Sequence, residues 1–302
     1  MAHLKGIALI VLGAMFWGAN GPMMQILFTE MGMSVSFLLA IRLLSAGIVL
    51  LVFLGLTKKP VFLVWKSKHW SRELVIFSVI GMLGIQYSFL ATIHASNAVF
   101  ATLIQFLGPI FIVGFVSLKC RTWPPRYQVL GILGTIIGLF LLLTNASLDS
   151  LLVSQEALIW GIIEGGAFAV YTLYPARLMK EFGVLVVVGW GMLIGGVIIC
   201  VSTLIWESKE WMFFTDLETV LLLGFSVLFG TLGFVFFLSS MKYISPVLTS
   251  VLSSVEPLTA MILSILLFHT TLAGWQFVGA FIMLICVTWL SVGEKPGESH
   301  GN

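Results

Sequence analysis

Long apolar runs alternate with short polar segments along almost the whole chain. Each run has roughly the 20 residues that an α-helix needs to cross the hydrocarbon core of a bilayer. The pattern predicts ten membrane-spanning helices, at residues 6–27, 34–56, 73–93, 96–117, 126–144, 157–177, 184–205, 217–239, 245–267 and 273–292. Very short links follow the third and eighth spans, which indicates antiparallel helical hairpins there.

The composition agrees with this pattern and excludes a soluble domain. Hydrophobic residues make up 59% of the chain and charged residues 9%. The three cysteines, Cys120, Cys200 and Cys286, show no paired spacing, so neither a disulfide framework nor a metal site is expected. The sequence also lacks HExxH, a nucleophile elbow and a Gly-rich phosphate loop. We therefore expect no catalytic residues, no cofactor and no nucleic-acid partner.

Lysine and arginine gather on one side of the predicted topology. Thirteen of them fall in the links or termini of that side, whereas Lys209 alone falls on the other and Arg42 lies inside the second span. Cytoplasmic loops carry the excess of these residues. Both termini, including the polar tail 293–302, are therefore expected in the cytoplasm.

The chain repeats itself. Residues 97–131 align without a gap with residues 245–279, which places Pro109 over Pro257. The repeat predicts two five-helix halves, 6–144 and 157–292, and an odd number of spans makes them insert in opposite orientations. This all-α, inverted-repeat architecture is typical of transporters, and the matched prolines mark places where gates would bend.

Glu164 is a carboxylate near the middle of the sixth predicted span. An ionisable residue at membrane depth is costly and indicates a functional site. Trp160, Phe168 and Tyr171 share its helical face. A carboxylate beside aromatic rings suits an organic cation, above all a quaternary ammonium, which has no N–H to donate. Simple helix packing remains the alternative for each ring.

Further polar and aromatic residues within spans extend this candidate site. The predicted substrate-binding residues are Trp17, Asn20, Tyr87, Gln105, Trp160, Glu164, Phe168, Tyr171 and Trp190, and the predicted coupling or gating residues are Glu164, Glu256, Pro109 and Pro257. Arg42 is expected to snorkel or to pair within the bundle, because it would repel a cationic ligand. For the same cationic site, the added carboxylate of betaine is expected to weaken binding.

Several stretches resemble the drug/metabolite transporter superfamily, in its ten-helix EamA branch. They are F-W-G-A-N of the first span, A-T-L-I-Q-F-L-G-P-I of the fourth, Q-V-L-G-I-L of the fifth and their second-half copies. Thr122 and Thr270 stand where many members have a glutamate. The resemblance implies that spans one to four and six to nine line the cavity, and that spans five and ten are peripheral.

Within that superfamily the chain is most similar to bacterial choline importers of the LicB type, on Trp17, Tyr87, Trp160 and Glu164. This implies import of choline across the bacterial plasma membrane, coupled to protons, for phosphocholine decoration of cell-surface polymers, by a monomer or homodimer. The alternative is an exporter of drugs or metabolites by cation/proton exchange on the same scaffold. A membrane enzyme or scaffold is a third alternative. The sequence leaves the direction of transport open.

Overall fold

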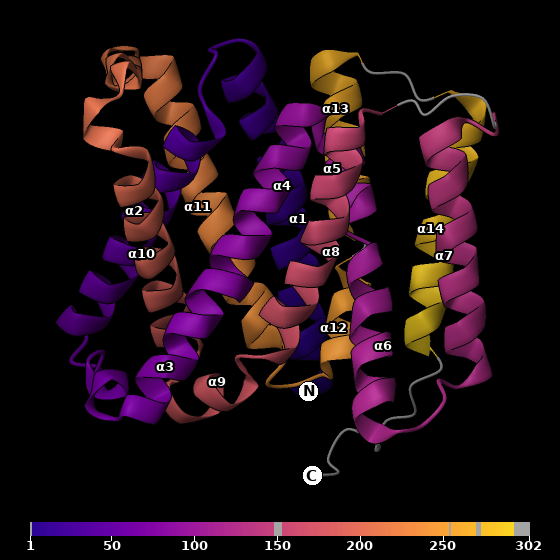
Figure 1. Ribbon diagram of the computed structural model, residues 1–302, viewed down its shortest axis with the longest axis horizontal. Coiled ribbons are helices and arrows are strands. Elements are labelled where there is room, and N and C mark those ends of the chain that lie inside the picture. The colour runs from indigo at the N-terminus through magenta and orange to yellow at the C-terminus, as the bar shows by residue number, and fades with distance from the viewer. Residues whose placement is uncertain (1, 148–152, 254, 270–272, 293–302) are drawn as a thin grey trace.

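The computed structural model describes residues 2–147, 153–253, 255–269 and 273–292, and this part of the chain forms helices and loops without strands (Figure 1). The α-helices are α1 (Ala2–Thr29), α2 (Val35–Leu56), α3 (Lys68–Ile76), α4 (Gly84–Ala95), α5 (Ala98–Ile104), α6 (Leu107–Cys120), α7 (Arg126–Thr144), α8 (Gln155–Leu173), α9 (Ala176–Phe182), α10 (Val184–Thr203), α11 (Leu217–Ser240), α12 (Pro246–Leu252), α13 (Val255–Phe268) and α14 (Gly274–Val292). A π-helical segment, η2 (Phe77–Leu83), joins α3 to α4, and 3₁₀ segments η1 (Leu63–Lys66), η3 (Ile205–Glu207) and η4 (Lys209–Thr215) lie in loops.

Seven described helical segments are long and apolar enough to cross a membrane. They are Ala2–Thr29, Val35–Leu56, Lys68–Ala95, Ala98–Cys120, Gln155–Phe182, Val184–Thr203 and Leu217–Ser240. Three shorter apolar helices, Arg126–Leu141, Val255–Phe268 and Gly274–Cys286, overlap the remaining predicted spans. The chain is thus a multi-span helical protein, while the ten-span layout stays a prediction.

Polar residues in the links start several of these helices. The side chains of Ser34, Asn97 and Ser154 each accept a bond from an amide of the first turn, at 3.2, 2.8 and 3.1 Å. Asp216 caps α11 and accepts from the amide and hydroxyl of Thr219, at 2.8 and 2.6 Å, and these bonds lower the pKa of Asp216. Such caps satisfy amides that have no partner inside the helix.

The helices pack in pairs that are far apart in the sequence. The pairs are α1 with α11, α4 with α8, α2 with α10, and α7 with α14. In the numbering of the predicted spans, span one packs with span eight, span three with span six, span two with span seven, and span five with span ten. If each span is replaced by the span five places along the chain, the same four pairs result, which is the symmetry expected of a five-span repeat.

Glycines bring α2 and α10 into close contact. A Cβ on Gly47 would lie 2.5 Å from the backbone nitrogen of Leu193, and a Cβ on Gly196 would lie 2.8 Å from that of Leu44. Only a residue without a side chain lets two helix backbones approach this far. The contact therefore depends on both glycines.

The pair α7 and α14 lies at one edge of the bundle, on the right in Figure 1. This agrees with the expectation that spans five and ten are peripheral. At the lower end of the same view, α3 and α9 lie near the N-terminus. These two helices and α1 carry five of the lysines and arginines assigned to one side of the predicted topology, so those charges gather at one end of the molecule.

Two of the predicted spans are broken near their prolines. Helix α5 ends at Ile104 before α6 begins at Leu107, and α12 ends at Leu252 before α13 begins at Val255. Pro109 and Pro257 are each the third residue of the second helix. A proline in a first turn lacks only an amide that would have no helical partner. The breaks therefore occur at matched positions in the two halves.

Candidate substrate-binding site

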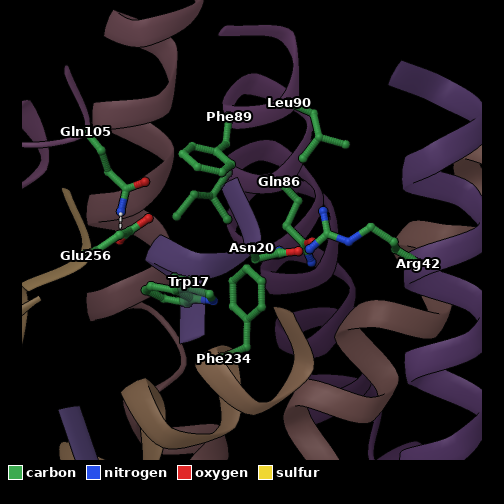
Figure 2. A pocket seen from close by; sticks show the side chains of 10 residues that line it. Trp17, Asn20, Arg42, Gln86, Phe89, Leu90, Gln105, Phe234 and Glu256 are labelled. Atoms are coloured by element: carbon green, nitrogen blue, oxygen red, sulfur yellow. Dashed lines mark hydrogen bonds between the residues drawn. The ribbon is translucent and has the colours of Figure 1, made fainter. Parts of the chain in front are cut away.

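A cavity, here called the central cavity, lies between α1, α2, α4, α11, α13 and the break between α5 and α6, and its empty space is about 350 Å³ when the open solvent at its mouth is included. Figure 2 shows the side chains that surround it. They are Trp17, Asn20, Arg42, Ile85, Gln86, Phe89, Leu90, Gln105, Phe234 and Glu256. Of the residues predicted for the site, it brings together Trp17, Asn20, Gln105 and Glu256.

Glu256 and Gln105 meet at one side of the central cavity. The Nε2 of Gln105 donates to Oε2 of Glu256 at 3.2 Å, and Glu256 is 3% exposed. Gln105 lies at the break between α5 and α6, and Glu256 lies in the first turn of α13. Gln105 thus lies in the helix break of one predicted half and Glu256 directly after the break of the other, and their bond joins the two predicted halves at this side of the cavity.

Arg42 enters the central cavity from the opposite side in Figure 2. Its side chain is 5% exposed and comes from the middle of α2. Nη1 contacts the sulfur of Met24 at 2.8 Å, and Nε has no hydrogen-bond partner. Within the described chain no carboxylate forms an ion pair with it. The cavity thus contains one basic and one acidic side chain that are not paired with each other.

Three buried polar atoms of side chains that line the central cavity have no hydrogen-bond partner in the described part of the chain. They are Nε1 of Trp17, Oδ1 of Asn20 and Nε of Arg42, which are two donors and one acceptor. Buried polar groups are normally hydrogen-bonded, and each exception requires an explanation. All three belong to side chains that line the central cavity.

Aromatic rings hold Trp17 in place. Its ring lies 4.8 Å from that of Phe234, edge to face, and 5.1 Å from that of Phe237. Gly233 makes this arrangement possible, because a Cβ there would overlap the indole. Phe89 adds a further ring to the cavity wall. A cation in the cavity would therefore face aromatic surfaces as well as Glu256.

A second cavity of about 200 Å³ adjoins the first. It shares Gln105 and Glu256 with the central cavity and is otherwise lined by Thr102, Phe106, Pro109, Phe168, Ser253 and Pro257. Both predicted gating prolines and the predicted site residue Phe168 thus lie beside the bond between Gln105 and Glu256.

Glu164 is fully buried but does not line the central cavity. Neither carboxylate oxygen has a hydrogen-bond partner. The hydroxyl of Thr92 lies within reach, yet it donates its proton to the carbonyl of Ser88 at 2.8 Å. Glu164 is also close enough to Glu256 for the two charges to repel each other when both are ionised.

The aromatic residues around Glu164 lie in different places. Tyr171 is enclosed by rings that include Phe77 and Phe234, at 6.0 and 5.4 Å. Tyr87 and Trp160 contact each other edge to face at 5.4 Å and do not line the central cavity. The predicted cage of Trp17, Tyr87 and Trp160 is therefore not assembled in this conformation.

Trp190 belongs to a separate cluster. Its Nε1 donates to the carbonyl of Val61 at 2.8 Å, and its ring packs edge to face against Trp65 at 5.1 Å. A satisfied indole between a loop and a helix is a structural anchor. Trp190 lies outside both cavities.

Reasoning from the sequence missed several residues that line the central cavity, chief among them Arg42, Gln86, Phe89 and Phe234. Arg42 had a clear signal, since it is the one basic residue away from the ends of a predicted span. The assumption of a purely cationic ligand removed it from consideration. The phenylalanines had no local signal, because apolar residues surround them on every side.

Comparison of the sequence with known proteins identifies the family of this helical membrane protein. The model of the EamA-like transporter family matches residues 4–144 and 155–292. The chain belongs to the EamA-like transporter family. It is accordingly a multi-pass protein of the bacterial plasma membrane.

Two relatives and one solved structure extend the comparison. The chain is 37% identical over 293 residues to "Uncharacterized inner membrane transporter YicL" of Salmonella typhimurium strain LT2, which covers 96% of both chains. It is 25% identical over 218 residues to "Uncharacterized transporter YyaM" of Bacillus subtilis strain 168, with 70% of both chains covered. A solved structure described as "Crystal structure of protein" superposes with a TM-score of 0.66 over 99% of both chains at 16% identity, which shows a shared fold.

Proposed function

We propose that this EamA-like transporter is a secondary active transporter that carries a small organic cation through the central cavity, with choline as the first cargo to test. Family membership supports transport. The observation that supports this site is the buried carboxylate of Glu256 beside aromatic rings, at a point where two broken helices meet. Discontinuous helices form the cargo sites of many transporters.

The chemistry of the cavity suits a quaternary ammonium group. Such a group needs a counter-charge and ring faces, which Glu256, Trp17, Phe89 and Phe234 supply. A cation over a ring contributes roughly 0.5–2 kcal/mol. Three rings and a carboxylate would then support micromolar affinity, which requires about −8 kcal/mol.

The transport cycle follows from the proposed inverted repeat. Halves 6–144 and 157–292 would rock about the cavity, with both termini in the cytoplasm, and would expose it to one side of the membrane at a time. The bond between Gln105 and Glu256 joins the halves. Binding of the cargo cation at Glu256 would weaken this bond, and Pro109 and Pro257 would allow the adjoining helices to bend.

Two carboxylates allow two coupling schemes. Proton symport, which fits import, needs cargo and proton bound together. Glu256 would then bind the cargo and Glu164, outside the cavity, would bind the proton. This assignment reverses the roles expected from the sequence. Exchange, which fits an exporter of drugs or metabolites, needs binding of one to weaken binding of the other. The repulsion between Glu164 and Glu256 favours this second scheme, because a cation on Glu256 relieves it.

Uptake of radiolabelled choline into proteoliposomes tests the proposal. An inside-negative potential should drive saturable uptake by the wild-type protein, and Glu256→Gln should reduce it at least tenfold. Glu30→Gln is the matched control, because Glu30 is exposed at the end of α1. Folding is checked by size-exclusion chromatography and thermal unfolding. No choline uptake by folded wild-type protein would contradict choline as the cargo.

A further inference from the structure

The guanidinium of Arg42 is the feature of the central cavity that a cationic cargo leaves unexplained. It is 5% exposed, its Nε has no partner among the described residues, and its Nη1 contacts the weakly accepting sulfur of Met24. Within the described residues it makes no ion pair. A buried arginine is costly unless an anion and hydrogen-bond acceptors compensate it. A structural arginine would be expected to have such partners inside the protein.

The backbone of α11 makes room for this guanidinium. A Cβ on Gly230 would overlap Nη2 of Arg42 and would lie 3.2 Å from Nδ2 of Asn20. In Figure 2 the guanidinium enters from the right and ends beside the side-chain amides of Asn20 and Gln86. The Nε2 of Gln86 donates to the weakly accepting sulfur of Met82 at 3.5 Å. Guanidinium and amide donors thus converge at this end of the cavity, which is a setting suited to a carboxylate.

The opposite end of the cavity has the complementary chemistry. Glu256 and Gln105 form a buried acceptor site, and Trp17 and Phe234 lie between the two ends in Figure 2. A simple cation bound at Glu256 would share the cavity with the unpaired charge of Arg42. A simple anion would leave Glu256 uncompensated. A solute with both charges compensates both residues.

We propose that the cargo is a zwitterion whose carboxylate binds Arg42 and whose cationic group binds Glu256, with its carbon chain against the aromatic wall. This inference rests on the proposed function and narrows the cargo of the same site. It reverses the expectation from the sequence that a carboxylate added to the cation weakens binding.

Calorimetry on the purified full-length protein tests the inference. The probes are trimethylammonium carboxylates with one, two or three methylenes between the charged groups, the corresponding primary amines, and choline. The methyl ester of each acid is the matched probe, because it keeps the cation and the chain and loses the negative charge. At least one acid should bind at least tenfold more tightly than its ester and than choline. The best chain length then reports the spacing between the two binding groups.

Variants of Arg42 assign the preference to this residue. Arg42→Gln should lower the affinity for the best acid at least tenfold, while the affinity for its ester should stay the same or rise. Arg42→Lys should lower the affinity for the acid by a smaller factor. If Arg42→Gln does not fold, Gly230→Ala provides a second test, because it crowds the guanidinium from the backbone side. It should reduce the preference for the acid over its ester.

The outcomes separate this inference from the proposed function. If the esters or choline bind the wild-type protein as tightly as the acids do, the inference that the cargo is a zwitterion is wrong. Choline uptake into proteoliposomes would in that case still support the proposed cation transporter. Uptake of a zwitterion without uptake of choline would support the inference and remove choline as cargo. Binding of none of these probes, or a preference for the acids that Arg42→Gln leaves unchanged, would overturn the inference.

Discussion

The indole nitrogen of Trp17 is a donor in the central cavity that can be removed with a modest change in packing. It has no hydrogen-bond partner among the described residues, so Trp17→Phe removes a donor that a cargo in the cavity could use. We expect cargo affinity to fall about 2- to 10-fold, because one hydrogen bond contributes roughly 0.5–1.5 kcal/mol. Calorimetry measures this change. Trp65→Phe is the control, since Trp65 packs on Trp190 outside the cavities. Unchanged affinity in Trp17→Phe would show that the indole N–H does not contact the cargo.

Individual residues also show which parts of the candidate site can be predicted from the local sequence and which cannot. Trp17, Gln105 and Glu256 stood out because polar or indole groups are rare within apolar spans. Glu164 stood out for the same reason and lies buried outside the central cavity. Spacing along a helix tells which residues share a face, but the neighbour that this face meets is set by packing of distant helices. Arg42 illustrates the converse, because its place in the cavity depends on Gly230 of α11.

At the scale of elements, the contact between α2 and α10 can be tested through its glycines. Gly47→Ala should destabilise the protein by about 1–3 kcal/mol, because the new methyl group meets the backbone of Leu193 and the helices must separate. Gly55→Ala is the matched control on the same helix, since a Cβ there has no heavy atom within 4 Å. Thermal unfolding in detergent measures both. Equal stability of the two variants would mean that the bundle adjusts without cost.

Helical elements follow from hydrophobic length, and each of the ten predicted spans overlaps a helix. Their interruptions are less visible in the sequence. Pro109 and Pro257 indicated where two spans would bend, yet the breaks begin one turn earlier, at Gln105 and after Leu252. The π-helical segment η2 had no signal, because one extra residue in a helical turn leaves apolar composition unchanged. Irregular turns of this kind depend on packing of the surrounding helices.

The orientation of the whole molecule can be measured with single cysteines. Cys120, Cys200 and Cys286 are first replaced by alanine, and then Lys209→Cys or Lys68→Cys is introduced at an exposed position. In intact cells a membrane-impermeant maleimide should label residue 209 and should label residue 68 only after permeabilisation. The reason is the excess of lysine and arginine on the side of Lys68. The opposite labelling pattern would invert the proposed topology.

The charge of the cargo decides which force can drive the whole transport cycle. A membrane potential acts on a net charge with about 2.3 kcal/mol per 100 mV, equivalent to roughly 50-fold accumulation of a monovalent cation. A zwitterion has no net charge, so the potential alone cannot concentrate it. If the cargo is a zwitterion, its accumulation in proteoliposomes should require a coupled ion. The test imposes a potential with valinomycin while the pH is buffered to the same value on both sides. Under these conditions the potential can drive uptake of a zwitterion only through the charge of the coupled ion.

A pH gradient without a potential separates the coupling schemes. In symport, an acidic exterior should drive accumulation of the cargo, whereas exchange requires an acidic interior. Glu164 is the proposed proton acceptor, because it is buried and both of its oxygens lack partners. Glu164→Gln should therefore slow gradient-driven net uptake more than it slows cargo exchange at equal pH. Radiolabelled flux measures both rates in the same vesicles. Equal slowing of both rates would remove Glu164 from the coupling step and leave Glu256 as the site where proton and cargo compete.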